Sequence, residues 1–381
     1  MKVTLPVAQL QEVMDLVSRF VSKHSTLPIL ENIYIKGNID TIVFRATDME
    51  KYIEIEIPAK LNDEGALTVN SKTLFDIIKA IDEEHAIIVI EESKDMMTIK
   101  TASDEFKIKG IPASEYVAVP VVQSDHPVTL STEAFGKGIG KVEYAVTEKN
   151  FSPVLTGVFM RVKEYDGKKK LVFVGTDSFR LAEYKLDFSG SNVGNFALIV
   201  PKVHINDIKK VADYALDHGA KQMKTMFSEN MVSFEFDLKE MKVLTTSLLI
   251  QGTFPEYENE NIMPTSHTSK IVFDKGDMEK AIKKISILTR DINNFINVQS
   301  DSDKLLLSSG ETDLGEGQTS AAAVVDGEKI QFGVNGKYIA DFLRIVSSQE
   351  VTMRVINAEK PVIFKDNDDE NYTYVVRPLI K

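Results

Sequence analysis

The chain has no cysteine and no tryptophan, and aromatic residues make up 8% of its 381 residues. The lack of thiols excludes a disulfide framework, thiolate catalysis and cysteine-ligated metal sites. No apolar run approaches the roughly 20 residues that a membrane-spanning helix needs. The N-terminal segment lacks the pattern of a secretory signal peptide. We therefore expect a cytoplasmic protein with no membrane partner.

The sequence also lacks the common catalytic and cofactor motifs. It contains no Walker lysine loop, no dinucleotide glycine fingerprint and no nucleophile-elbow serine. The six histidines are scattered, without the spacing of a metal site: His24, His85, His126, His204, His218 and His267. Three glycines (Gly136, Gly138 and Gly140) interrupt a helical pattern, where we expect close backbone packing. We predict no catalytic residues, no metal and no cofactor.

The net charge of −12 argues against a nucleic-acid partner, but the charge is unevenly distributed. Six segments with helical periodicity hold 17 Lys/Arg and 13 Asp/Glu: 7–23, 72–82, 131–149, 202–217, 275–290 and 335–346. These segments are net basic, while the remainder of the chain is strongly acidic. Solvated charge pairs on helix faces would also explain this contrast.

The chain opens the same way three times. Residues 3–5, 128–130 and 271–273 each form a short β-rich run followed by an amphipathic helical pattern. The apolar positions coincide without a gap: Leu10, Met14, Val17 and Val21; Phe135, Ile139, Val142 and Val146; Met278, Ile282, Ile285 and Thr289. The offsets are those of whole domains, so one small fold was used three times.

A second repeated helix confirms this register. Residues 69–82, 200–213 and the segment from 334 onward align, with Asp76, Asp207 and Asp341 at the same position. Three residues later each copy carries a base: Lys79, Lys210 and Arg344. Two matches in the same order in all three thirds indicate tandem duplication.

Alternating apolar runs between the helices predict about eight antiparallel strands in each third. We expect an α+β fold in which each third packs its two helices on one face of an antiparallel sheet. Proline-containing endings at residues 110–112 and 253–255 suggest boundaries. The predicted domains are residues 1–125, 126–262 and 263–381.

Several segments resemble the bacterial sliding clamp, the β subunit of DNA polymerase III. They are spread through the chain in the family's order: 25–32, 46–48, 175–182, 254–257, 334–338 and 374–379. Each segment alone is weak evidence, but the ordered set over a threefold repeat is strong. The resemblance implies three tandem DNA clamp domains that close, as a head-to-tail homodimer, into a six-domain ring.

The family further implies a non-catalytic processivity subunit that encircles double-stranded DNA without reading its sequence. Its expected protein partners are the polymerase III α subunit, the clamp loader δ subunit and other clamp-motif proteins. Basic side chains on the helices would contact phosphates: Arg19, Lys23, Lys79, Lys137, Lys141, Lys209, Lys210, Lys280, Lys283, Lys284 and Arg344. His24, where a relative has arginine, and Lys149 align with DNA-contacting loops.

The resemblance also implies a peptide-binding pocket between the second and third domains. Its residues, carried over by position, are Leu155, Thr176, Ser178, Phe179, Arg180, Leu181, Pro255, Ile262, Asn335, Tyr338, Val375, Val376, Pro378 and Leu379. An apolar groove with a polar rim suits an extended peptide. Phe179 replaces a histidine of relatives and Arg377 replaces a methionine.

The dimer interface implied by the family would join Phe106 and Ile108 of one subunit to Ile287 and Leu288 of the other. The residues of 106–108 could instead face their own core. Two other functions stay open on the residues alone. One is a hydrolase at a domain boundary using Asp177 and Arg180, although an ion pair beside a turn explains that pair more simply. The other is a structural repeat protein without a DNA role.

Overall fold

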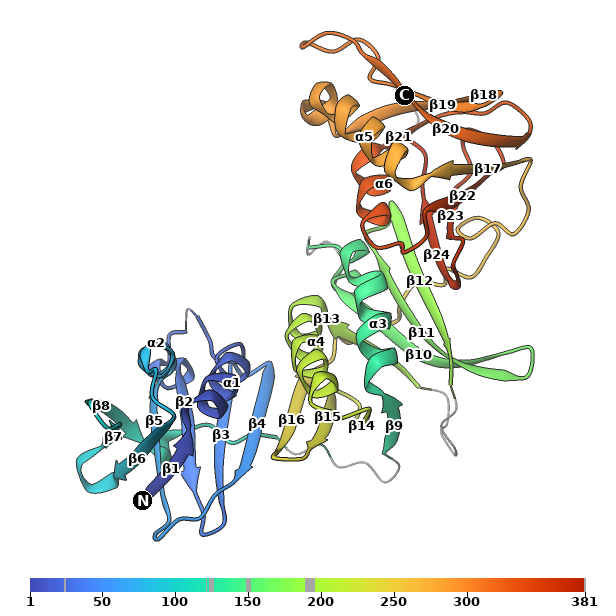
Figure 1. The fold of residues 1–381 in the computed structure, drawn as a ribbon. Coiled ribbons are helices and arrows are strands. Elements are labelled where there is room, and N and C mark those ends of the chain that lie inside the picture. The colour runs from blue at the N-terminus through green and yellow to red at the C-terminus, as the bar shows by residue number, and fades with distance from the viewer. Residues whose placement is uncertain (24, 121, 123–126, 149–151, 189–195, 380–381) are drawn as a thin grey trace. The chain divides into compact units, whose positions relative to one another are not determined.

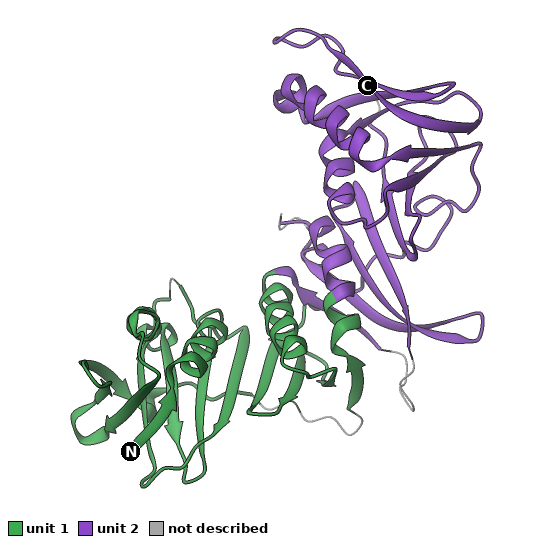
Figure 2. Cartoon of the chain, in the orientation of Figure 1, with its two compact units in different colours: residues 1–136, 190–193, 203–250 green, residues 137–189, 194–202, 251–381 purple. Residues whose placement is uncertain are grey.

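The computed structural model describes the chain except residues 24, 121, 123–126, 149–151, 189–195 and 380–381. The described chain divides into two compact units (Figure 2). The first unit contains residues 1–136 and 203–250, and the second contains residues 137–188, 196–202 and 251–379. Each unit is built on one antiparallel sheet of 12 strands.

The sheet of the first unit has the strand order β1-β6-β7-β8-β5-β2-β3-β4-β16-β15-β14-β9 (Figure 1). Its strands are β1 (Lys2–Pro6), β2 (Asn32–Gly37), β3 (Thr41–Thr47), β4 (Lys51–Pro58), β5 (Gly65–Asn70), β6 (His85–Glu91), β7 (Met96–Lys100), β8 (Glu105–Pro112), β9 (Val128–Ser131), β14 (Gln222–Phe227), β15 (Met231–Leu238) and β16 (Met241–Leu248). Helices α1 (Val7–Val17) and α2 (Ser71–Ala80) pack against each other beside this sheet.

The sheet of the second unit has the strand order β13-β10-β11-β12-β24-β23-β22-β17-β20-β19-β18-β21. Its strands are β10 (Gly157–Tyr165), β11 (Lys168–Thr176), β12 (Arg180–Asp187), β13 (Ala197–Pro201), β17 (Ser269–Asp274), β18 (Phe295–Asp301), β19 (Lys304–Ser308), β20 (Gln318–Gly327), β21 (Gln331–Asn335), β22 (Glu350–Val355), β23 (Val362–Asp366) and β24 (Asp369–Val376). Helices α5 (Lys275–Thr289) and α6 (Gly336–Leu343) pack together.

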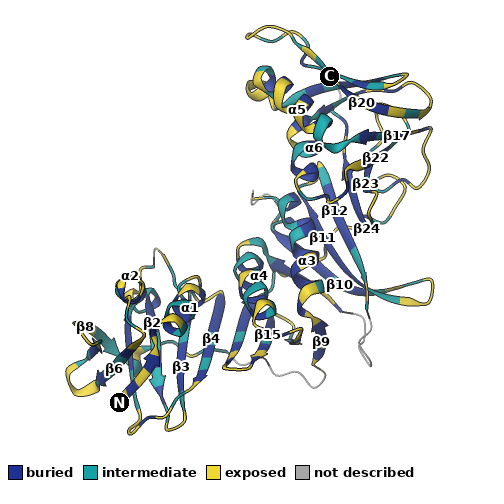
Figure 3. Ribbon diagram, in the orientation of Figure 1, coloured by how far each residue is buried: buried dark blue, intermediate teal, exposed yellow. Residues whose placement is uncertain are grey.

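The threefold repeat predicted from the sequence is confirmed. Each third contains eight of the described strands and two of the described α-helices; the central pair is α3 (Thr132–Val142) and α4 (Lys202–Asp217). The expected apolar helix positions are buried, except Val21, which is half-buried. Figure 3 shows dark buried strands and helices that expose one face. The amphipathic periodicity therefore identified the core face of each helix.

Local signals in the sequence fix where several helices begin. The side chain of Asn70 accepts a hydrogen bond from the Thr73 N–H at 3.0 Å at the start of α2. Asp274 accepts from the Asp277 N–H at 2.8 Å before α5, and Asn335 accepts from the Lys337 N–H at 2.9 Å before α6. These caps satisfy backbone donors that a helix leaves free in its first turn.

Sheet pairing continues across the boundaries of the thirds, which explains why the two units do not coincide with them. Strand β4 of the first third pairs with β16 of the second, and β12 of the second pairs with β24 of the third. The central third therefore contributes strands to both sheets. The boundaries near residues 125 and 262 stay predictions.

The glycines of α3 pack as expected at one position. A Cβ on Gly138 would lie 2.3 Å from ring carbons of Phe173, so only glycine lets the helix approach that ring. No helix among the described residues is long and apolar enough to cross a bilayer. No cluster of three or more potential metal ligands occurs in that part of the chain either.

Candidate functional site

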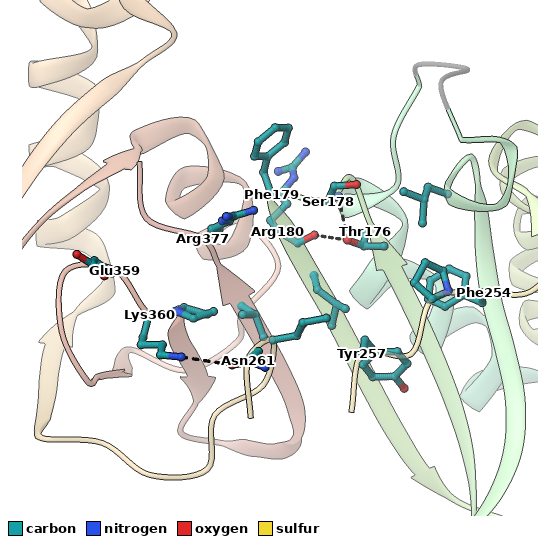
Figure 4. Close-up of a pocket in the computed structure, with 16 residues that line it drawn as sticks. Thr176, Ser178, Phe179, Arg180, Phe254, Tyr257, Asn261, Glu359, Lys360 and Arg377 are labelled. Atoms are coloured by element: carbon teal, nitrogen blue, oxygen red, sulfur yellow. Dashed lines mark hydrogen bonds between the residues drawn. The ribbon is translucent and has the colours of Figure 1, made fainter. Parts of the chain in front are cut away.

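The main candidate site is a cavity of about 560 Å³ in the second unit (Figure 4). Its walls come from the end of β11, the following turn, the start of β12, the end of β24 and three loops. Leu155, Leu181 and Val375 supply an apolar floor, and each is almost fully buried. A concave apolar site of this volume can accept several side chains of a ligand.

Nine predicted pocket residues line this cavity together: Leu155, Thr176, Ser178, Phe179, Arg180, Leu181, Pro255, Ile262 and Val375. The other five do not line it: Asn335, Tyr338, Val376, Pro378 and Leu379. Each of the five has a local structural role, and a part in peptide binding stays a prediction for the half-buried Asn335, Tyr338 and Leu379.

The prediction is wrong for Val376. Successive side chains of a strand point to opposite faces, so Val375 faces the cavity and Val376 is fully buried on the other face. Asn335 caps α6 through its side chain. The carbonyl of Tyr338 accepts from the Tyr374 hydroxyl at 3.0 Å, and its ring lies 4.6 Å from the Arg180 guanidinium.

Pro378 and Leu379 also lie outside the lining of the cavity. Pro378 is buried, and the Leu379 N–H donates to the Gly333 carbonyl at 2.9 Å, so the chain turns toward β21 here. Both positions therefore also have a role in the fold itself.

Seven lining residues were absent from the predicted pocket: Phe254, Tyr257, Asn261, Glu359, Lys360, Pro361 and Arg377. Phe254 stacks on Phe159 with ring centres 4.4 Å apart, and the Tyr257 hydroxyl donates to Glu183 at 2.8 Å. The sequence did contain a signal for Phe254 and Tyr257, because both belong to segment 254–257, which resembles the sliding-clamp family.

Arg180 lines the cavity with its stem and turns its guanidinium to carboxylates. Nε donates to Asp177 at 2.9 Å, one terminal nitrogen donates to Asp341 at 2.8 Å, and the other donates to the Tyr144 carbonyl at 2.9 Å. Burial alone would lower the pKa of Arg180, but Tyr374 and the two carboxylates raise it. The Asp177–Arg180 pair is therefore an ion pair beside a turn, as the simpler interpretation held.

The turn before Arg180 has a fixed hydrogen-bond pattern. The Thr176 hydroxyl donates to the Arg180 carbonyl at 2.6 Å, and Asp177 accepts from the N–H groups of Phe179 and Arg180, both at 3.0 Å. Ser178 adopts a positive φ of 76°. We call this arrangement, with the ion pair from Arg180 to Asp341, the second clasp.

The first unit contains the same arrangement, which we call the first clasp. The Thr47 hydroxyl donates to the Lys51 carbonyl at 2.9 Å, Asp48 accepts from the Lys51 N–H at 2.9 Å, and Met49 has a φ of 79°. Lys51 forms an ion pair with Asp207, which is the repeat counterpart of Asp341. Each clasp lies where two thirds join through strand pairing.

Most of the predicted DNA-contacting bases lie exposed on or beside the helices. Arg19 and Lys23 follow α1 and line a polar groove of about 480 Å³. Lys79, Lys210, Lys283 and Lys284 are exposed and have no carboxylate within ion-pair distance among the described residues. The remaining exposed or half-buried bases already have a partner: Lys137 with Asp369, Lys209 with Asp213, Lys280 with Asp277 and Arg344 with Asp341.

The prediction is wrong for Lys141. Its side chain is buried, with Nζ 3.4 Å from an Asp366 carboxylate oxygen, 3.2 Å from the Ile345 carbonyl and 4.8 Å from the Tyr372 ring centre. A cation enclosed in this way cannot reach a phosphate. His24 and Lys149 lie outside the described residues.

The predicted interface residues differ in exposure. Ile287 is 61% exposed and Leu288 is half-buried, and their part in a dimer interface stays a prediction. Phe106 is half-buried, whereas Ile108 is only 6% exposed and faces its own unit. In the single chain, Ile108 therefore faces its own core, which was the alternative to a place in the interface.

Family models match the chain along almost its full length. The N-terminal, central and C-terminal domains of the DNA polymerase III beta subunit match residues 1–120, 129–256 and 260–380. The chain belongs to the DNA polymerase III beta subunit family. Membership identifies it as a beta sliding clamp, a non-catalytic processivity subunit, so the hydrolase and the structural repeat protein without a DNA role are both rejected.

Individual relatives agree with this assignment. The beta sliding clamp of Synechocystis sp. is 25% identical over 399 residues, covering 100% of this chain and 99% of the relative. That of Staphylococcus aureus strain Mu50 is 27% identical, with 94% of both chains covered.

Solved clamps share the fold. The Bacillus subtilis sliding clamp has a TM-score of 0.90 at 23% identity, covering 100% of this chain and 99% of that one. The Bartonella birtlesii clamp, solved bound to griselimycin, has a TM-score of 0.91 at 23% identity and full coverage of both chains.

Proposed function

We propose that two copies of this chain close head to tail into a ring around duplex DNA, and that the 560 Å³ cavity binds peptides of the polymerase and other partners. The observation that carries the ring is the repetition of one strand junction. At each junction within the chain, the strand after a clasp pairs with the last strand of the following third: β4 with β16, and β12 with β24.

The third copy of this junction lacks its partner within the described chain. The first half of β20, residues 318–322, pairs with β19 on one side only, and residues 105–109 of β8 pair only with β7. In the threefold repeat, β20 corresponds to β4 and β12, and β8 corresponds to β16 and β24. A third junction of the same kind would therefore pair β20 with β8. An unpaired edge is a template for another chain, so β20 of one copy would pair with β8 of the second.

The exposed bases on the helices support sequence-independent DNA binding. Lys79, Lys210, Lys283 and Lys284 remain without carboxylate partners among the described residues, although the chain is acidic overall. Phosphate contacts by such side chains supply affinity that falls with salt and carries no sequence information. Weak phosphate contacts are sufficient for a ring, because a ring that encloses the duplex stays on the DNA without tight binding.

The cavity supports the docking of partner proteins. Its apolar floor is bordered by polar groups of Thr176, Ser178 and Asn261, which suits side chains of an extended peptide. The polymerase III α subunit and the clamp loader δ subunit are the partners we propose for it.

Retention on circular DNA tests the ring. After loading by a bacterial clamp loader, the full-length protein should stay on a nicked plasmid during gel filtration and be lost once the plasmid is linearised. Replacing Lys283 and Lys284 by alanine should reduce loading at moderate salt, while Lys329→Ala, an exposed lysine outside the helices, should not. Equal retention on circular and linear DNA would reject topological linkage.

A further inference from the structure

Arg377 occupies one end of the cavity. It is the first residue after β24 and shares the strand face of Val375, so its side chain continues the cavity wall. Its backbone N–H donates to the Phe179 carbonyl at 2.8 Å, which holds the two residues together. The Phe179 ring is 50% exposed and lies beside Arg377 in Figure 4.

Of the three cations that line the cavity, Arg377 is the one with no ion-pair or side-chain hydrogen-bond partner among the described residues. Arg180 is engaged by Asp177 and Asp341, and Lys360 Nζ lies 3.3 Å from the Asn261 side-chain oxygen. Glu359, the carboxylate in the lining, is drawn apart from Arg377 in Figure 4. Within the described chain, no carboxylate comes within ion-pair distance of the Arg377 guanidinium.

We propose that Arg377 makes this cavity selective for peptides with an Asp or Glu side chain next to the apolar residues that fill it. The inference rests on the proposed docking role of the cavity and adds a chemical preference to it. The lining of the cavity indicates what kind of peptide would bind. The apolar floor would accept leucine- or phenylalanine-like side chains, and the guanidinium of Arg377 at the end of the cavity would bind a carboxylate.

Arginine is suited to this task because its planar guanidinium forms paired hydrogen bonds with a carboxylate. The neighbouring exposed Phe179 ring adds an apolar surface over which the aliphatic part of an acidic side chain can lie. Because Arg377 is exposed, the interaction should be modest and weakened by salt.

A positional peptide set tests the preference. The probes are fluorescent hexapeptides with leucine and phenylalanine anchors, in which every other position carries Asp, Asn or Lys in turn. We expect one position at which Asp binds the full-length protein about fivefold more tightly than Asn at low salt, and at which Lys binds more weakly still. The ratio should shrink as salt is raised.

Arg377→Met should abolish the Asp-over-Asn ratio at that position while preserving the affinity of the Asn peptide. Lys329→Gln, which changes an exposed lysine that does not line the cavity, is the control and should keep the ratio. Equal loss in both variants, or no position that prefers Asp, would overturn the role of Arg377 while peptide docking stands. Failure of every peptide to bind would instead count against the docking function itself.

Discussion

At the scale of single residues, Arg180 is the most connected side chain near the cavity. Its guanidinium compensates Asp341, which is nearly fully buried and whose pKa the neighbouring Lys337 and Arg180 hold below its ordinary value despite burial. Without Arg180, the buried Asp341 would keep Lys337 and Arg344 as partners, whose more exposed cations compensate its charge less well.

Arg180→Met should therefore lower the free energy of unfolding by about 3 kcal/mol, measured by chemical denaturation of the full chain. Arg344→Met removes a contact to the same Asp341, 3.3 Å long, from an exposed side chain and should cost under about 1 kcal/mol. Similar losses in the two variants would show that the buried pair has no special weight.

His204 gives the first unit a pH dependence. The ring is buried, with Nδ1 2.9 Å from the Ser247 hydroxyl and Nε2 3.4 Å from Glu50. Burial lowers the pKa of His204 below 6.5, and Lys51 adds to this, although Asp48 and Glu50 oppose it. The unfolded chain then binds a proton at a higher pH than the folded chain does, so stability falls as the pH drops below about 6.5.

We expect His204→Gln to lose less stability than the natural sequence between pH 7 and pH 5.5, by up to about 1.4 kcal/mol per pH unit. Urea midpoints measured along this range provide the comparison. His85→Gln, which changes an exposed histidine, should leave the pH profile as it is. A profile unchanged by the His204 substitution would show that its folded and unfolded pKa values are alike.

At the scale of elements, the sequence predicted most of the fold because periodicity reports burial directly. The helices, and the strand that precedes the first helix of each third, were found from spacing alone, since every copy buries the same apolar positions. The pocket was predicted less completely. Its loop members Asn261 and Glu359–Pro361 carry no periodic signal, and Val376 was misplaced because a position list does not fix strand parity.

The glycines of α3 provide a prediction at this scale. Glycine to alanine usually stabilises a helix by about 1 kcal/mol, but a Cβ at Gly138 would overlap the Phe173 ring. Overpacking of this kind costs about 1–3 kcal/mol. Gly138→Ala should therefore lower the thermal midpoint, as followed by circular dichroism.

Gly136→Ala is the matched control two residues earlier in the same helix. Its Cβ would lie 3.1 Å from a side-chain oxygen of Asp213, which can move away. This variant should be neutral or stabilised. If the two variants have the same thermal midpoint, then the close approach of α3 to Phe173 does not require glycine at position 138.

At the scale of the whole molecule, the third junction differs from the other two. The Ser309 hydroxyl oxygen accepts a hydrogen bond from the Gly317 N–H at 3.0 Å. In the two clasps, Asp48 and Asp177 accept the corresponding hydrogen bond from the N–H of Lys51 and of Arg180. Gly317 therefore occupies the position that a cationic residue has in each clasp. A Cβ at Gly317 would lie 2.7 Å from Leu288. We infer that apolar packing by α5 replaces the ion pair at the proposed subunit interface.

That replacement makes Ile287 and Leu288 the side chains to change. Aspartate at both positions would remove apolar surface worth about 2 kcal/mol for each residue buried on dimerisation and would place two charges there. We expect sedimentation velocity at micromolar concentration to give a dimer for the natural sequence and a monomer for the double variant. Val203→Asp, at a similarly exposed apolar residue of α4, should remain dimeric. A folded double variant that still sedimented as a dimer would move the interface away from α5 and from the edge of β20.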